Sequence, residues 1–119
     1  MVKIDKLRGS FSYAFQGWQF ALKNDQNIRI HLLIAFLVIL ASFYFGLSIV
    51  EKSILVGMIV LVISCELMNT AVEKMVDLIT TEHRMDAKFA KDVSSAMVLT
   101  SAVGSVIVGL IVFFPHVFS

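Results

Sequence analysis

The chain has 119 residues, of which 58% are hydrophobic and 16% charged, with a formal net charge of +1 and one proline. This composition excludes an ordinary soluble domain, because too few polar side chains remain to cover an aqueous surface. The small net charge, without runs of like charge, excludes a nucleic-acid-binding arm, and the one cysteine, Cys65, excludes an intrachain disulfide framework. The bilayer is therefore the expected solvent.

The first predicted element is a helix at about residues 8–26 that lies in the membrane interface. It carries the aromatic residues Phe11, Tyr13, Phe15, Trp18 and Phe20 among small and polar residues, with basic residues on both sides. This mixture is typical of an amphipathic helix with its aromatic rings at headgroup depth. The alternative is a helix packed on its own bundle. A removable signal peptide is not expected, because the first 23 residues lack a long apolar stretch.

Three apolar stretches follow, at about residues 30–50, 53–80 and 90–114, the last ending at Pro115. Each is long enough to span the hydrocarbon core, which takes about 20 apolar residues. The sequence thus predicts a single-domain, all-α integral membrane protein with three transmembrane helices and an N-terminal interfacial helix. Small residues on the third span favour close helix approach and a homo-oligomer; they are Ala96, Ser101, Ala102, Gly104, Ser105 and Gly109.

Basic residues predict the orientation. They gather before the first span and around the connection between the second and third: Lys3, Lys6, Arg8, Lys23, Arg29, Lys74, Arg84, Lys88 and Lys91. Only Lys52 lies in the other connection. By the positive-inside rule, the N-terminus and the 80–92 connection are expected in the cytoplasm of a multi-pass plasma-membrane protein.

The second span carries a polar stripe. Glu66, Asn69, Glu73 and Asp77 fall within about 80° of one another on a helix of 3.6 residues per turn. One interpretation is that these side chains hold helices together through hydrogen bonds. However, three crowded carboxylates repel one another, and a divalent cation offsets that repulsion. The stripe therefore favours a Mg²⁺ and phosphate site at the membrane surface.

Two further polar clusters flank the spans. In Ala90–Ser95, Lys91 can offer an ammonium group to phosphate oxygens, and Asp92 can orient that lysine or assist a metal. The alternative there is an ordinary helix start with a snorkelling lysine. In Asp25–His31, an acid and an arginine stand at the edge of the first span, where an arginine is commonly an orientation anchor.

Several common catalytic patterns are absent from the sequence. The glycines form neither GxGxxG nor GxxxxGK, and no HRD or DFG motif occurs, which excludes Rossmann, Walker A and protein-kinase sites. The three histidines have no ligand spacing, so no zinc site is expected. Any phosphoryl transfer must be organised on helix faces.

The segments ELMNTAVEKMVDL and AKDVSSA resemble the two signatures of the prokaryotic diacylglycerol kinase family, in order and at the family's spacing. NIRIH, NTA and DVSSA resemble the Gram-positive undecaprenol kinase branch most closely. The resemblance covers nearly the whole chain. It implies ATP- and Mg²⁺-dependent phosphorylation of a lipid alcohol, undecaprenol first and diacylglycerol as the alternative. It also implies a homotrimer with composite sites between protomers.

The resemblance also implies individual roles. Glu66 matches the catalytic base, which takes the proton from the lipid hydroxyl, and Glu73 matches a metal ligand. Asp25 stands where the family usually has a metal-binding glutamate. The positions that match the surroundings of the nucleotide and its phosphates are Tyr13, Asp25, Asn69, Glu73, Asp77, Glu82, Arg84, Lys91 and Asp92.

Two other classes of protein are also considered. A small oligomeric transporter would use intramembrane carboxylates to carry a cation or protons. The acids, however, cluster toward one end of the second span instead of at its midplane. A structural assembly subunit would leave the carboxylates of Glu66, Glu73 and Asp77 costly and unexplained. A lipid kinase accounts for the stripe better than either.

Overall fold

The computed structural model describes residues 1–118, and within them every regular element is an α-helix. The helices are α1 (Ile4–Asn24), α2 (Gln26–Tyr44), α3 (Ile49–Ile79) and α4 (Met85–Val117). Helices α2, α3 and α4 run alongside one another as a bundle, and α3 packs against both neighbours. Each of these three is long and apolar enough to cross a membrane. The all-α fold with three spans is confirmed.

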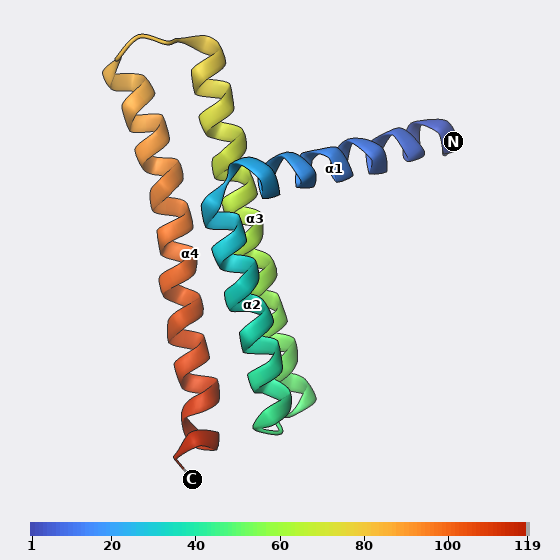
Figure 1. The fold of residues 1–119 in the computed structure, drawn as a ribbon, viewed down its shortest axis with the longest axis vertical. Helices are drawn as coiled ribbons and strands as arrows, with labels where there is room; N and C mark the ends of the chain where they lie inside the picture. The colour runs from blue at the N-terminus through green and yellow to red at the C-terminus, as the bar shows by residue number, and fades with distance from the viewer. Residues whose placement is uncertain (119) are drawn as a thin grey trace.

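Helix α1 projects sideways from the bundle at the start of α2, and α3 and α4 continue past that point to their connection (Figure 1). Its aromatic side chains are largely exposed, with Phe11 at 70% and Phe15 at 65%, and Ala21 in the last turns is its buried residue. The alternative of a helix packed along its own bundle is therefore wrong. An apolar helix at a large angle to the spans has the shape that an interfacial position requires, and that position stays a prediction.

The boundary between α1 and α2 falls earlier than the expected residue 26. Asp25 has extended backbone angles (φ −113°, ψ 107°) and accepts a hydrogen bond from Asn27 N at 2.9 Å, which makes it the N-cap of α2. Arg29 Nη1 reaches back to the carbonyl oxygens of Leu22 and Lys23 at 3.1 and 3.3 Å. These carbonyls lack helical partners at the end of α1, so the arginine ties the two helices together.

The connection between α2 and α3 is tight, and it ends α2 at Tyr44, earlier than the expected residue 50. Gly46 has φ +65°, a left-handed conformation that glycine adopts without steric cost, and Leu47 N donates to Ser42 O at 3.0 Å. Ser48 and Glu51 then form a reciprocal capping box that starts α3 at Ile49. Local backbone chemistry thus fixes the bend.

Helices α3 and α4 are longer than a bilayer crossing requires. Their 31 and 33 residues correspond to about 46 and 50 Å, against about 30 Å of hydrocarbon. Contrary to expectation, Pro115 does not end α4, which continues to Val117. A proline so close to the C-terminus removes one of the last helical hydrogen bonds and leaves the turn in place. The extra length lets polar residues near the 80–84 connection lie beyond the hydrocarbon.

The apolar core of the protomer lies at the end of the bundle opposite α1. It consists of Leu47, Leu55 and Val112, packed with Val38 and Phe113. Elsewhere most large apolar side chains on the spans remain exposed, as expected where lipid replaces water as the solvent. Glu66 and Asn69, two of the buried polar residues, lie outside this core in the C-terminal half of α3.

Candidate functional site

Glu66 lies on the face of α3 that packs against α2 and is 1% exposed. Neither of its carboxyl oxygens has a hydrogen-bond partner among the described residues. Burying a carboxyl group without partners is costly in any protein interior and more so within a membrane. A group retained at such a cost is a candidate for chemistry, because apolar packing would serve the fold better.

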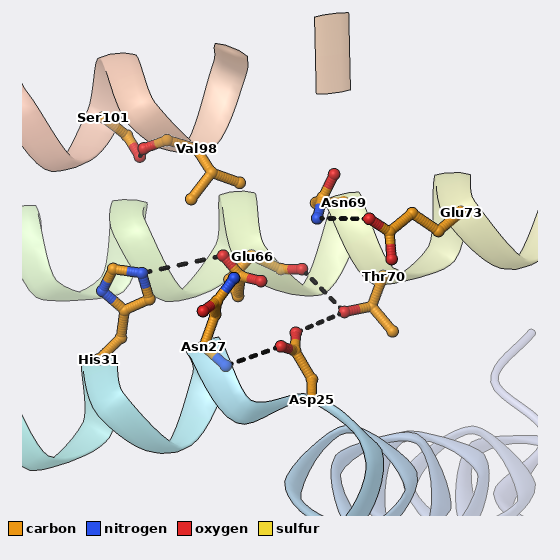
Figure 2. A network of polar contacts seen from close by, with 9 residues as sticks. All are labelled: Asp25, Asn27, His31, Glu66, Asn69, Thr70, Glu73, Val98 and Ser101. Atoms are coloured by element: carbon orange, nitrogen blue, oxygen red, sulfur yellow. Dashed lines mark hydrogen bonds and ion pairs between the residues drawn. The ribbon is translucent and has the colours of Figure 1, made fainter. Parts of the chain in front are cut away.

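Asp25 stands beside this carboxyl at the start of α2. Its Oδ2 accepts a hydrogen bond from the Thr70 hydroxyl of α3 at 2.8 Å (Figure 2), and Thr70 Oγ1 also lies 3.2 Å from the Glu66 carbonyl oxygen. Partial burial raises the pKa of Asp25, but the hydrogen bonds from the Thr70 hydroxyl and the backbone at Asn27 lower it more. The net pKa is below the ordinary value, so Asp25 is an anion at neutral pH.

His31, two turns into α2, faces the same carboxyl. Its Nε2 lies 3.8 Å from Glu66 Oε2, and Figure 2 shows the ring pointing from α2 toward α3. The side chain is 21% exposed. No pattern in the sequence singles out this histidine, because its partner lies 35 positions further along the chain.

One turn beyond Glu66, Asn69 and Glu73 form a second pair. Asn69 Nδ2 donates to Glu73 Oε1 at 3.4 Å, while Asn69 Oδ1 is buried without a partner. Within residues 1–118 no three His, Cys, Asp or Glu side chains converge on one metal position. The donors that are present are carboxylate and amide oxygens, the type that Mg²⁺ prefers. The buried Asn69 oxygen and the exposed Glu73 carboxylate fit part of such a site, to which other ligands must be added.

A second polar cluster joins α3 to α4 near the 80–84 connection. Lys91 Nζ donates to Asp77 Oδ1 at 2.7 Å, and Lys88 Nζ donates to Asp92 Oδ2 at 2.6 Å. In this structure Asp92 therefore contacts Lys88 and not Lys91, and its alternative role of assisting a metal stays a prediction. Adjacent residues on a helix point about 100° apart, whereas residues four apart share a face, so Asp92 pairs with Lys88.

The connection at residues 80–84 closes one side of a cavity of about 470 Å³. Glu82 N donates to Thr80 Oγ1 at 3.0 Å, and Arg84 N donates to Glu82 O at 3.0 Å, which holds the connection in a compact turn. Charged and polar side chains from α3, the connection and α4 line the cavity: Asp77, Thr80, Thr81, Glu82, His83, Arg84, Lys88 and Lys91. The predicted nucleotide-side residues Asp77, Glu82, Arg84 and Lys91 thus share one cavity.

Within one protomer the predicted site residues divide into two groups. Asp25, Glu66, Asn69 and Glu73 form the inner cluster, and the residues around the 470 Å³ cavity, with Asp92, form the loop cluster. Asp77 lies eleven positions after Glu66, which corresponds to about 16 Å along α3. Tyr13 joins neither group, since it is 74% exposed on α1.

Thr70 and His31 are the functional candidates that the sequence analysis did not assign. Thr70 lies inside the NTA segment, and its contact with Asp25 depends on how α2 crosses α3. His31 also lines a groove of about 280 Å³ between α2, α3 and α4, whose other lining residues are apolar except Ser105. No local pattern in the sequence identifies either contact, because both join helices that are distant along the chain.

Comparison with known proteins places this geometry in a family. The family described as prokaryotic diacylglycerol kinase matches residues 12–113, which include both polar clusters. Its match therefore covers most of the chain.

Individual relatives are similar over almost the same length. The undecaprenol kinase of Bacillus subtilis is 39% identical over 95% of this chain and 92% of its own. A diacylglycerol kinase of Haemophilus influenzae is 34% identical over 91% of this chain and 92% of its own. A diacylglycerol kinase of Synechocystis is 37% identical over 92% of this chain but only 63% of its own.

Proposed function

Because the chain belongs to the prokaryotic diacylglycerol kinase family, we propose that it transfers the γ-phosphoryl group of ATP to the hydroxyl of undecaprenol. The resemblance noted in the sequence is confirmed, as is the enzyme class of a lipid kinase. A phosphate donor, a lipid acceptor and a multi-pass place in the membrane come with that class. ATP, Mg²⁺ and the polyprenol belong to the proposal.

The observation that carries the proposal is the buried, unpartnered carboxyl of Glu66 beside an apolar groove. Ile63, a groove residue, lies one helical turn before Glu66. A lipid alcohol whose chain occupies the groove therefore presents its hydroxyl to this carboxyl. A water-soluble acceptor would not bind favourably in the groove, because the walls of the groove are apolar.

The chemistry requires little beyond position and charge. Glu66 accepts the proton of the lipid hydroxyl, whose oxygen forms a bond to the γ-phosphorus. The bond from that phosphorus to the bridging oxygen breaks, and ADP leaves with the electron pair. Lys91 neutralises charge on the phosphates, and the loop cluster covers the nucleotide, with Asp77, Asp92, Glu82 and Arg84 around it.

We assign Mg²⁺ to Glu73 and Asp25, with Asn69 Oδ1 as a further oxygen donor. When bound, the ion supplies neutralisation of the phosphate charge. Asp25 already accepts two hydrogen bonds, and each of its oxygens has a second lone pair for a metal. Glu73 is exposed and reachable by a phosphate-bound ion.

The proposal includes a homotrimer in the plasma membrane, with α1 and the 80–84 connection on the cytoplasmic side. The basic residues support that orientation. The distance of about 16 Å along α3 from the Glu66 position to the Asp77 position of one protomer supports composite sites. In such a site a neighbouring protomer brings its own loop cluster, or Tyr13 on its α1, to the inner cluster.

Diacylglycerol is the second candidate acceptor, since the relatives from Haemophilus influenzae and Synechocystis carry that name. The relative with the highest identity among those compared, at 39%, is an undecaprenol kinase, which favours the polyprenol. Both alcohols offer a primary hydroxyl on an apolar tail, so the chemistry at Glu66 is the same for either.

The test is phosphorylation by the purified protein in mixed micelles with ATP and Mg²⁺. Undecaprenol and diacylglycerol are offered separately and then in competition, and kcat/KM is measured for each. We expect kcat/KM for undecaprenol to exceed that for diacylglycerol by at least about tenfold, a difference of about 1.4 kcal/mol in transition-state binding. A higher kcat/KM for diacylglycerol overturns the assignment of undecaprenol as the acceptor. Failure of the folded protein to phosphorylate either alcohol overturns the proposed function.

A further inference from the structure

His31 occupies the boundary between the apolar groove and the inner cluster. Its ring lines the groove of about 280 Å³, while its Nε2 lies 3.8 Å from Glu66 Oε2. The groove residues that follow on α2 are Ile34, Ala35 and Val38, each further from the inner cluster along the helix. His31 is therefore the polar residue at the end of the groove nearest Glu66.

The carboxyl of Glu66 has no hydrogen-bond partner within the part of the chain that the structure describes, and the polar side chains that Figure 2 shows on α3 and α4 are engaged in other hydrogen bonds. Asn69 donates one of its two amide hydrogens to Glu73 Oε1, one turn away, at 3.4 Å (Figure 2). Ser101, on the α4 face shown in the same view, donates its hydroxyl to Val98 O of its own helix at 2.8 Å.

Thr70, the remaining hydroxyl in this view, is also engaged, because it donates to Asp25 at 2.8 Å. His31 Nε2, in contrast, lies within ion-pair distance of Glu66 Oε2 and makes no hydrogen bond to another described residue. The separation of 3.8 Å exceeds a hydrogen bond by under about 1 Å, and catalytic hydrogen bonds in empty sites are commonly long and tighten when substrate binds.

We propose that His31 is a positioning residue for the phosphoryl-transfer reaction: its Nε2–H donates to one oxygen of Glu66 and so aims the other at the lipid hydroxyl. The proposal rests on the proposed function, in which Glu66 accepts the hydroxyl proton. It adds a residue on α2 that orients the base, in the way that a histidine or carboxylate orients the base in other acid–base catalysts. The proton passes from the hydroxyl to Glu66 alone, and His31 keeps its own.

Substitutions at His31 separate orientation from simple packing. His31→Gln keeps an N–H donor at about the reach of Nε2, His31→Asn places the donor closer to the backbone, and His31→Leu removes it. Ile30→Leu is the matched control, because Ile30 is the preceding residue of α2 and is 44% exposed. Each variant is purified as the full chain, and its thermal midpoint and oligomeric state are compared with those of the wild type.

Steady-state kinetics give the first readout. We expect His31→Leu and His31→Asn to lower kcat by about thirtyfold, in the range by which a misoriented base slows a reaction, with KM for MgATP unchanged within about twofold. His31→Gln retains at least about a third of the wild-type kcat, and Ile30→Leu is unaffected. A kcat within about threefold of wild type in His31→Leu overturns the proposal. So does an equal loss in the Gln and Leu variants when both melt and assemble like the wild type.

Infrared spectroscopy gives a readout that does not depend on activity. The carboxyl band of Glu66 is isolated as the difference between each protein and its Glu66→Gln counterpart. We expect the band to shift in His31→Leu and to return toward the wild-type position in His31→Gln. If the wild type phosphorylates no lipid alcohol, the proposed function fails while this band still reports the contact. A band that is identical in the wild type and in His31→Leu overturns the inference about His31.

Discussion

The inner cluster and the loop cluster differ in burial and in pairing. In the inner cluster, Glu66 is 1% exposed and both of its carboxyl oxygens lack partners. In the loop cluster, the side chains of Lys91 and Asp77 are 40% and 57% exposed and meet at 2.7 Å. The inner cluster holds an ionisable group in a buried position, where its charge costs free energy. The loop cluster holds its charged groups at the surface, where solvent stabilises them.

This difference indicates a division of labour between the clusters. An unpaired buried carboxyl is ready to accept a proton, because it has no competing hydrogen bond to break. Exposed ion pairs contribute little to stability and exchange partners readily, so a phosphate can replace Asp77 as the partner of Lys91. Substitutions in the inner cluster should therefore change the chemical step, and a substitution of Lys91 in the loop cluster should change nucleotide binding.

The largest effect is expected from Glu66→Gln, which keeps the shape of the side chain but removes the base. We expect kcat to fall by about a thousandfold or more, within the range for loss of a general base. The thermal midpoint should stay the same or rise, because an uncharged amide is less costly to bury. Lipid-kinase assays and thermal melts of the purified protein provide the measurements. Substantial turnover by a well-folded variant would refute the assignment of the base.

Asp25→Asn should have the next largest effect. It removes the negative charge assigned to the metal while keeping an acceptor for the Thr70 hydroxyl. We expect kcat to fall about a hundredfold, as happens when a charged group is removed from a reacting centre.

The matched variant is Thr70→Val, which leaves the Asp25 carboxylate but removes the hydroxyl that orients it. Its loss should be smaller, about tenfold, corresponding to one hydrogen bond to a charged group. A titration of activity with Mg²⁺ separates the two: the half-saturating concentration should rise in Asp25→Asn far more than in Thr70→Val. Equal Mg²⁺ dependence in both would remove Asp25 from the metal site.

Lys91→Met tests the loop cluster. We expect KM for MgATP to rise about tenfold with a smaller change in kcat, because one charge-assisted contact to a phosphate is lost. The thermal midpoint should not change, since the pair with Asp77 is exposed. Glu66→Gln gives the opposite pattern, with a large loss in kcat. If Lys91→Met instead unfolds the protein at ordinary temperature, the exposed pair is structural and the division between clusters is wrong.

The smallest effect is expected from Lys88→Met. Lys88 and Asp92 are 63% and 54% exposed and lie four residues apart on one helix face. Such pairs contribute little to helix stability, so the thermal midpoint should stay within its measurement error. The values of kcat and KM should stay within about twofold of the wild type. A strong rise in KM for MgATP would instead assign Lys88 to the phosphates beside Lys91.

Much of this molecule could be predicted without a structure. Apolar stretches of about 20 residues predict spans, since an apolar helix of that length has no stable place in water. The spacing of Glu66, Asn69, Glu73 and Asp77 predicts one helix face, because the helical repeat alone sets that face. The predicted helix ends were less accurate. Because Gly46 adopts the αL conformation and Asp25 is an N-cap, two helix boundaries differ by several residues from the predicted ones.

The division of the stripe into a buried and an exposed half was decided by the tertiary structure. Sequence periodicity places residues on a face but does not say which part of the face another helix covers. In the protomer Glu66 and Asn69 are buried, whereas Glu73 and Asp77 are exposed. The pairing of Lys91 with Asp77 likewise depends on how the connection at residues 80–84 returns α4 beside α3.

The sequence by itself therefore determined the solvent, the number of spans, the polar face and the family, because each depends on composition, local periodicity or motif order. Only the tertiary structure placed His31 against Glu66 and Thr70 against Asp25, residues that are 35 and 45 positions apart. Contacts of that kind depend on the crossing of two helices, which side-chain packing along their whole length sets. No short segment carries that information.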